Sequence, residues 1–225
     1  MTTRRSTTRS PAGASTSTTR DRLLTAGLRL FADRGFDAVS VGEIERAVGL
    51  VPRRGGLYRH FASKEDLLHA AVDRHLGSVT AGREQFNRPA ASDVRTDAVL
   101  LAWWILDELD RQHDITRVLE RDGHRLPHLR DTFRRDVSEV AYASMADILR
   151  AWLTDCIGAD LPADELDAVA THLLGALINL RRSTWTLGQP PASLDDHRAT
   201  HAWAELCTRI VGEPPQPPAQ DQCAR

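Results

Sequence analysis

The sequence has 225 residues, of which 41% are hydrophobic and 27% are charged, and this balance is ordinary for a globular protein. Its longest apolar stretch, residues 98–106, is too short to cross a bilayer, so the composition excludes a membrane-spanning protein. The formal net charge of −2 hides an asymmetry, because residues 1–76 carry 13 Lys and Arg against 8 Asp and Glu, whereas the remainder is acidic. A basic N-terminal part on an acidic body is typical of a module that faces a polyanion.

No pattern in the sequence indicates a metal or an enzymatic centre. Three scattered cysteines form no paired motif, which favours a reducing compartment, and we expect a cytoplasmic protein. His124 and His128 are four residues apart, but Pro127 keeps them from sharing one helix face, so we expect no metal site. Nucleophile elbows, phosphate-binding loops and dinucleotide fingerprints are absent, and we predict no catalytic residue and no cofactor.

The N-terminal segment and the first helix differ sharply in composition. Residues 1–18 are rich in Thr, Ser and Arg and have little apolar surface, so we predict a disordered basic arm. The arginines of this arm either lie along DNA or are simply solvated. A first helix is expected from about Thr19 to Asp33, with Leu24, Leu28 and Phe31 on one face.

Two short helices separated by a glycine are predicted next. Ser40 stands three residues before Glu43, which is the spacing of a helix-capping box. Gly49 suits the end of that helix, and Pro52 suits the first position of another. A second helix opening with Arg53 and Arg54 makes the pattern a helix-turn-helix. The alternative is a surface hairpin with solvated arginines.

The flanking residues extend this pattern, and together they resemble the N-terminal DNA-binding domain of TetR-family transcriptional regulators. The residues that carry the resemblance are the first-helix run 22–36, Ser40, Val41, Ile44, Val48, Gly49, the L-Y-R-H-F run at 57–61 and the S-K-E-D-L-L run at 63–68. Most family members have two fewer residues between the turn glycine and the tyrosine, so residues 49–58 carry a two-residue insertion. The resemblance implies a helix-turn-helix domain over residues 19–78.

Each candidate DNA contact has a physical role and an alternative. Arg53 and Arg54 either read base edges from the start of the second helix or contact phosphates only. Tyr58 and His60 resemble family positions that bond phosphates, although the tyrosine ring is also suited to the core. Lys64 is expected in the first turn of the next helix, where its ammonium group and the backbone N–H groups would share a phosphate. The predicted DNA-binding residues are Ser40, Arg53, Arg54, Gly55, Tyr58, Arg59, His60 and Lys64.

Residues 79–212 are predicted to form a helical effector-binding and dimerisation domain, which makes the protein all-α. Helices are expected over residues 93–112, 115–121, 131–157, 163–187 and 194–211, the last capped by Ser193. The break at Pro89 suits a boundary region, and residues 213–225 are predicted to be a disordered Pro-rich tail. No segment alternates with period two for long enough to be a strand.

The resemblance implies a ligand-responsive repressor that acts as a homodimer on a palindromic DNA site. The pocket for a small-molecule effector is expected among the middle helices, with Trp103, Trp104, Tyr142 and Asn179 as candidates, unless these aromatic side chains fill the core. The dimer surface is expected on the last two helices, at Leu173, Ala176, Leu177, Leu180, Trp203, Leu206 and Ile210, unless both helices cover the chain's own core. A cofactor-independent helical enzyme or a small-molecule binding protein is the alternative function.

Overall fold

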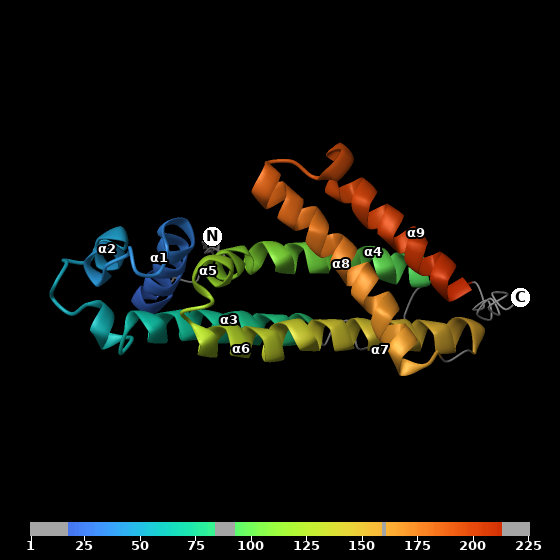
Figure 1. Cartoon of the computed structure of the whole chain (residues 1–225), viewed down its shortest axis with the longest axis horizontal. Coiled ribbons are helices and arrows are strands. Elements are labelled where there is room, and N and C mark those ends of the chain that lie inside the picture. The colour runs from blue at the N-terminus through green and yellow to red at the C-terminus, as the bar shows by residue number, and fades with distance from the viewer. Residues whose placement is uncertain (1–17, 84–92, 159–160, 213–225) are drawn as a thin grey trace, which may run out of the picture.

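The computed structural model describes residues 18–83, 93–158 and 161–212. Within these ranges every regular element is helical and none is a strand, which confirms the all-α prediction (Figure 1). The molecule is elongated, with α1 (Thr19–Arg34) and α2 (Val41–Ala47) near one end and α9 (Asp196–Gly212) extending towards the other. Residues 1–17 of the predicted arm, the break at Pro89 and the predicted tail lie outside the described residues.

The N-terminal helices begin where local chemistry predicts. Thr18 and Asp21 form a capping box at the start of α1, and Gly35 ends this helix with a φ of 92°. Ser40 and Glu43 form the predicted capping box of α2. The hydroxyl of Ser63 accepts a hydrogen bond from the Asp66 N–H at 2.9 Å at the start of α3 (Lys64–Arg83).

Within the described residues, the body contains five further α-helices and a π-helical segment before its last helix. They are α4 (Val94–Arg111), α5 (His113–Asp122), α6 (Pro127–Phe133), η2 (Arg134–Glu139), α7 (Val140–Ile157) and α8 (Ala163–Leu187), followed by α9. The helix expected to begin at Asp131 begins at Pro127 instead, because proline is favourable at the first helical position. The cap of α9 is Asp195 and not Ser193: Asp195 accepts the Arg198 N–H at 2.8 Å, whereas Ser193 lies in the preceding 3₁₀ turn.

Among the described residues, two hydrophobic cores hold these helices, and the first of them is not formed by the N-terminal helices alone. Leu28, Ile44 and Leu67 belong to this core, but Val118 of α5 and Leu129 of α6 are buried in it as well. Two body helices therefore close the core of the N-terminal module, and any movement of α5 or α6 acts on that module directly.

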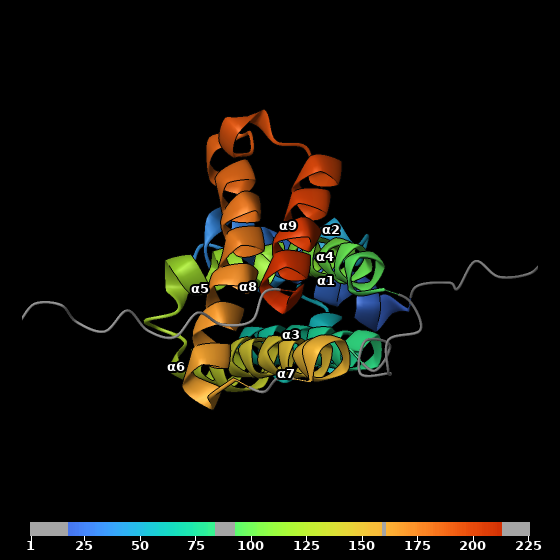
Figure 2. The same ribbon diagram turned by 90° about the vertical axis from the view of Figure 1, so that its right-hand side faces the viewer.

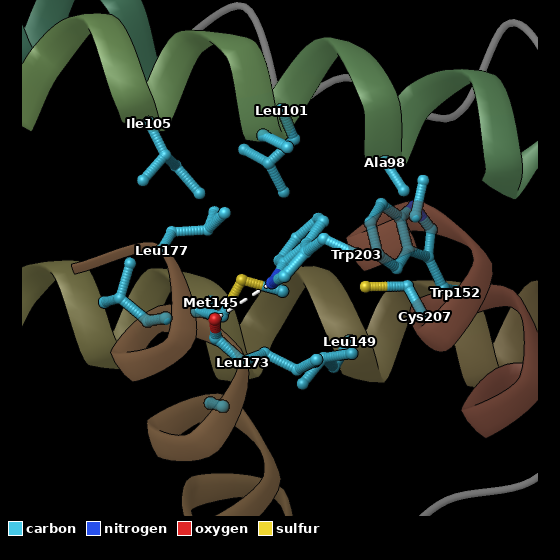
Figure 3. Close-up of a cluster of buried hydrophobic side chains, with 14 of the residues drawn as sticks. Ala98, Leu101, Ile105, Met145, Leu149, Trp152, Leu173, Leu177, Trp203 and Cys207 are labelled. Carbon is cyan, nitrogen blue, oxygen red and sulfur yellow. Dashed lines mark hydrogen bonds between the residues drawn. The ribbon is translucent and has the colours of Figure 1, made fainter. Parts of the chain in front are cut away.

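The second core lies between α4, α7, α8 and α9 (Figure 3). Trp203 of α9 reaches into its centre, and its indole N–H donates a hydrogen bond to the Leu173 carbonyl at 2.9 Å. Helices α8 and α9 both pack on α4 and α7 and project from the same side of the body (Figure 2). Each of these two helices therefore has an inner face buried in the chain and an outer face open to solvent.

Candidate nucleic-acid interface and cavity

Helix α2 is fixed at its start by a network of charged and polar groups. The Glu43 carboxylate accepts hydrogen bonds from the Ser40 N–H at 2.8 Å and from the Ser40 hydroxyl at 2.7 Å. Arg34 forms an ion pair with the same carboxylate at 2.6 Å. These bonds from Ser40 and Arg34 lower the pKa of Glu43 to about 2. The hydroxyl of Ser40, a predicted DNA contact, is therefore already used within the chain.

The segment after α2 does not form the second α-helix that the sequence predicts. Residues 51–56 form only turns, bends and irregular backbone, and Leu57–Arg59 forms a single 3₁₀ turn, η1. Arg53 has a φ of 66° and Gly55 a φ of 69°, both in the left-handed region that interrupts a right-handed helix. Pro52 therefore does not reopen an α-helix, and Arg53 and Arg54 lie in an extended turn. The segment in which a two-residue insertion is predicted includes this turn.

A buried carboxylate from α2 holds this turn in place. Glu45 is fully buried, and its two oxygens accept the Arg53 N–H at 2.9 Å and the Leu57 N–H at 3.0 Å. The side chains of Leu57 and Phe61 are buried in the first core and anchor the end of the segment. The turn is thus held at both ends although it lacks the hydrogen bonds of an α-helix.

The polar side chains of this segment point to solvent. Tyr58 is 60% exposed, so its ring does not belong to the core. Five of the predicted DNA-binding residues in this segment are exposed: Arg53, Arg54, Tyr58, Arg59 and His60. Gly55 is partly buried beside them. Three arginines and two aromatic hydrogen-bonding side chains on one short surface segment are suited to contact phosphates and base edges.

Lys64 has a different environment from the one predicted. Its ammonium group donates hydrogen bonds to the carbonyls of Phe36 and Val39, both at 2.8 Å, and lies 4.6 Å from the centre of the Phe36 ring. Two of its three donors are therefore used inside the chain. The structure gives Lys64 the role of joining the start of α3 to the loop between α1 and α2.

A cavity of about 320 Å³ lies in the helical body. Side chains from α4, α5, α7 and α8 line most of it, and the predicted residues Trp104 and Tyr142 are among them. Trp185 of α8, which no sequence pattern indicated, also lines the cavity and stacks on His113 at 4.3 Å. Trp103 and Asn179 are exposed and do not line it, so the structure does not support these two as pocket residues.

The cavity contains a carboxyl group that no motif in the sequence indicated. Glu108 of α4 is 7% exposed, and one of its oxygens lies 3.1 Å from Nδ1 of the buried His75 of α3. These two atoms are not oriented to form a hydrogen bond. The Glu108 oxygen has no other hydrogen-bond partner, and neither has Nε2 of His75. Burial raises the pKa of Glu108, and burial lowers the pKa of His75. The pair links α3, which follows the exposed turn, to a wall of the cavity.

Comparisons with known proteins agree with this arrangement of an N-terminal module on a helical body. The family model for bacterial regulatory proteins of the tetR family matches residues 23–71. A TetR-family transcriptional regulator from Mesorhizobium loti superposes with a TM-score of 0.63 and 19% identity, over 85% of this chain and 95% of that one. Residues 23–71 are thus similar to the N-terminal part of tetR-family regulatory proteins, and the described chain shares the fold of the Mesorhizobium loti regulator.

Curated relatives match this chain over shorter stretches. The transcriptional activator FasR of Mycolicibacterium smegmatis is 33% identical over 94 residues, which are 41% of this chain and 42% of FasR. The transcriptional regulator AcrR of Shigella flexneri is 45% identical over 49 residues, 22% of each chain. The chain thus spans less than half of either relative. A regulator from Saccharomonospora viridis in complex with choline has a TM-score of 0.62 and 22% identity, over 86% of this chain and 95% of that one.

The residues predicted to form the dimer surface lie partly on the inner faces of α8 and α9 and partly on their outer faces. Leu173, Leu177, Leu180 and Trp203 are buried in the chain's own core, so they are not available to a second chain. Ile210 is partly buried against the same core. Ala176 is exposed and Leu206 is 48% exposed, on the outer faces of α8 and α9.

The described residues contain neither a membrane-spanning helix nor a metal-binding cluster. Among them, no helix is long and apolar enough to cross a membrane. The same part of the chain contains no cluster of three or more His, Cys, Asp or Glu side chains that is arranged to bind a metal ion. His124 and His128 lie within that part.

Proposed function

We propose that this chain is a cytoplasmic transcriptional regulator that binds duplex DNA as a homodimer and responds to a small molecule. The observation that carries the proposal is the exposed turn after α2, where Arg53, Arg54 and Arg59 accompany Tyr58 and His60 on one surface. Glu45 presents this turn in one conformation before DNA arrives, because it holds two of its backbone N–H groups.

The extended turn favours contacts with phosphates over contacts with bases for its two adjacent arginines. An α-helix that enters the major groove presents its first residues to base edges, but Arg53 and Arg54 are not part of a helix. We therefore assign them to phosphates, and we assign Tyr58, Arg59 and His60 to the contacts nearest the groove. Arg54→Ala would then weaken binding to all sequences similarly.

The homodimer would use the outer faces of α8 and α9. Ala176 and Leu206 occupy these faces, and a two-fold contact between two copies would form a bundle of four helices. Two N-terminal modules related by this symmetry reach successive major grooves of a palindromic site when they are roughly 34–36 Å apart.

Helix α5 supports a link between the cavity and the DNA-binding module. On one side Arg117 pairs with Asp33 of α1 at 2.9 Å, and Asp122 accepts the Phe36 N–H at 2.9 Å. On the other side Thr116 lines the cavity and His113 stacks on Trp185. A ligand that displaces Trp185 would move α5, and with it the module, if it binds the two arrangements with different affinity.

A repressor released by its ligand is the simplest form of this regulation, and a ligand-dependent activator uses the same parts. The similar structure with choline supports a small-molecule site in such a helical body. The relative FasR is described as an activator. The sign of regulation depends on where the DNA site lies relative to the promoter.

A gel shift with the DNA upstream of the chain's own gene tests the proposal. We expect retardation at low salt without ligand, and weaker retardation of an unrelated duplex of equal length. Arg59→Ala should weaken binding, whereas Arg135→Ala, which removes an exposed arginine of the body, should not. Absence of binding, or equal loss in both variants, would contradict the assigned surface.

A further inference from the structure

We propose that the cavity binds an organic cation, an ammonium group with apolar substituents, and that Glu108 is its counter-ion. This inference rests on the proposed function, because it names the ligand class of the same cavity. It starts from a buried carboxyl group that faces the cavity and has an oxygen without a hydrogen-bond partner.

The charges around Glu108 leave room for a cation. Arg111 forms a long ion pair with one Glu108 oxygen at 3.5 Å, and the same guanidinium group also pairs with Asp107 at 2.5 Å. The second Glu108 oxygen faces His75, and burial lowers the pKa of that imidazole and so favours its neutral form. A buried carboxylate is costly unless it is fully paired, so a ligand that supplies a positive charge there is favoured.

The rest of the cavity suits the apolar part of such a ligand and its charge. Trp104, Tyr142 and Trp185 line it together with aliphatic side chains, and aromatic faces attract cations that have lost their water. Gly82 of α3 lies so close to Trp104 that a Cβ there would be 2.6 Å from the indole nitrogen. A ligand that moves Trp104 or Glu108 would therefore act on α3 as well.

An anionic ligand is the main rival, because Arg182 also lines the cavity. The Arg182 side chain is 59% exposed, however, and it pairs with Glu120 at 2.8 Å. Its charge is thus hydrated and already neutralised by a carboxylate of α5. The buried titratable group is an acid that can carry a negative charge, whereas the positive charge is exposed, so the observations favour the cation.

Three probes that share one carbon skeleton but differ in charge test the ligand class: cationic phenylbutylamine, neutral phenylbutanol and anionic phenylbutyrate. Binding to the full-length protein without DNA is measured by calorimetry and by the fluorescence of the cavity tryptophans. We expect the amine to bind at least about tenfold more tightly than the alcohol, and the acid to bind most weakly. Equal binding of amine and alcohol, tightest binding of the acid, or no binding of any probe would overturn the proposal.

Matched variants show which charged side chain is responsible for the preference for the amine. Glu108→Gln keeps the side-chain shape and should remove the preference for the amine, whereas Asp107→Asn removes the adjacent exposed carboxylate and should preserve it. Arg182→Gln should leave amine binding intact. Thermal melts confirm that each variant folds, and a retained preference in folded Glu108→Gln would overturn the assignment.

DNA binding is measured separately, so that the two proposals fail separately. If the amine binds through Glu108 but leaves DNA affinity unchanged, the ligand class stands and the regulatory coupling is wrong. If DNA binding is absent from the start, the proposed function is wrong, and the calorimetry still decides the ligand class.

Discussion

The buried carboxylate of Glu45 accepts the backbone N–H of Leu57 at 3.0 Å and thereby joins α2 to the last turn before α3. The same side chain also accepts the Arg53 N–H at 2.9 Å. One residue of α2 thus replaces part of the hydrogen bonding that the missing second helix would have supplied. The exposed turn depends on Glu45 for its shape.

Replacing Glu45 tests that dependence. In Glu45→Ala both N–H groups lose their acceptor, and the free energy of unfolding should fall by about 1–3 kcal/mol because buried donors are costly when unpaired. Glu45→Gln keeps one acceptor oxygen and should show an intermediate loss. Chemical denaturation measures both variants.

The control for Glu45 is Glu65→Ala, an exposed glutamate in the first turn of α3. It should change the free energy of unfolding by no more than about 0.5 kcal/mol, as is usual for surface positions. If Glu45→Ala is as mild as Glu65→Ala, the hydrogen bonds to the turn do not stabilise the fold.

Arg53 has an unfavourable backbone conformation, and its side chain is proposed to contact a DNA phosphate. A non-glycine residue at a φ of 66° is strained, so Arg53→Gly should raise the free energy of unfolding by about 1 kcal/mol. The same variant loses a cation and should bind DNA more weakly. Thermal melts and DNA titrations should therefore move in opposite directions. A variant that is both more stable and equally tight on DNA would show that Arg53 makes no contact.

The sequence predicts local features of this fold well, because their causes are local. Ser40 and Ser63 cap helices through hydrogen bonds within three residues, and the spacing of Ser40 and Glu43 predicts the first of these caps. The turn after α2 was predicted as a helix because Pro52 suits a helix start. Its true shape depends on Glu45, whose hydrogen bonds reach Arg53 and Leu57, eight and twelve residues along the chain.

The cavity and the dimer surface were harder to predict, because both depend on contacts between residues that are far apart in the sequence. Periodicity shows that Leu177 and Trp203 lie on apolar faces, but it does not show whether a face meets the chain's own core or a second chain. Glu108 meets His75 only because α3 and α4 are neighbours in space. No short-range pattern joins these two residues in the sequence.

The dimer surface is tested on the outer faces of α8 and α9. Leu206→Arg places a charge on the proposed contact and should convert a dimer into a species of the chain mass, 25.0 kDa, in light scattering. Ile157→Arg, at an exposed apolar position at the end of α7, should leave the dimer intact. A wild-type monomer, or a dimer that survives Leu206→Arg, would contradict the proposed surface.

Acid should weaken the start of α2 over a defined range of pH. The folded-state pKa of Glu43 is about 2, below its ordinary value of 4.5, so its ionised form stabilises the folded state above about 4.5. That stabilisation is lost as the pH falls towards about 2. At neutral pH the free energy of unfolding of the wild type should exceed that of Glu43→Gln. This difference should shrink as the pH falls from about 4.5 towards about 2. A difference that is constant with pH would exclude the carboxylate as its cause.

The salt dependence of DNA binding is the sharpest test of the proposed DNA-binding surface. Fluorescence anisotropy should give a Kd for the upstream DNA that rises linearly with salt on logarithmic axes, because phosphate contacts release counterions. When Arg53 and Arg54 are both replaced by alanine, the slope should fall by about one for each phosphate that a chain no longer neutralises, and the sequence preference should remain. An unchanged slope, or no binding at low salt without ligand, would contradict the claim that the turn after α2 is the DNA-binding surface.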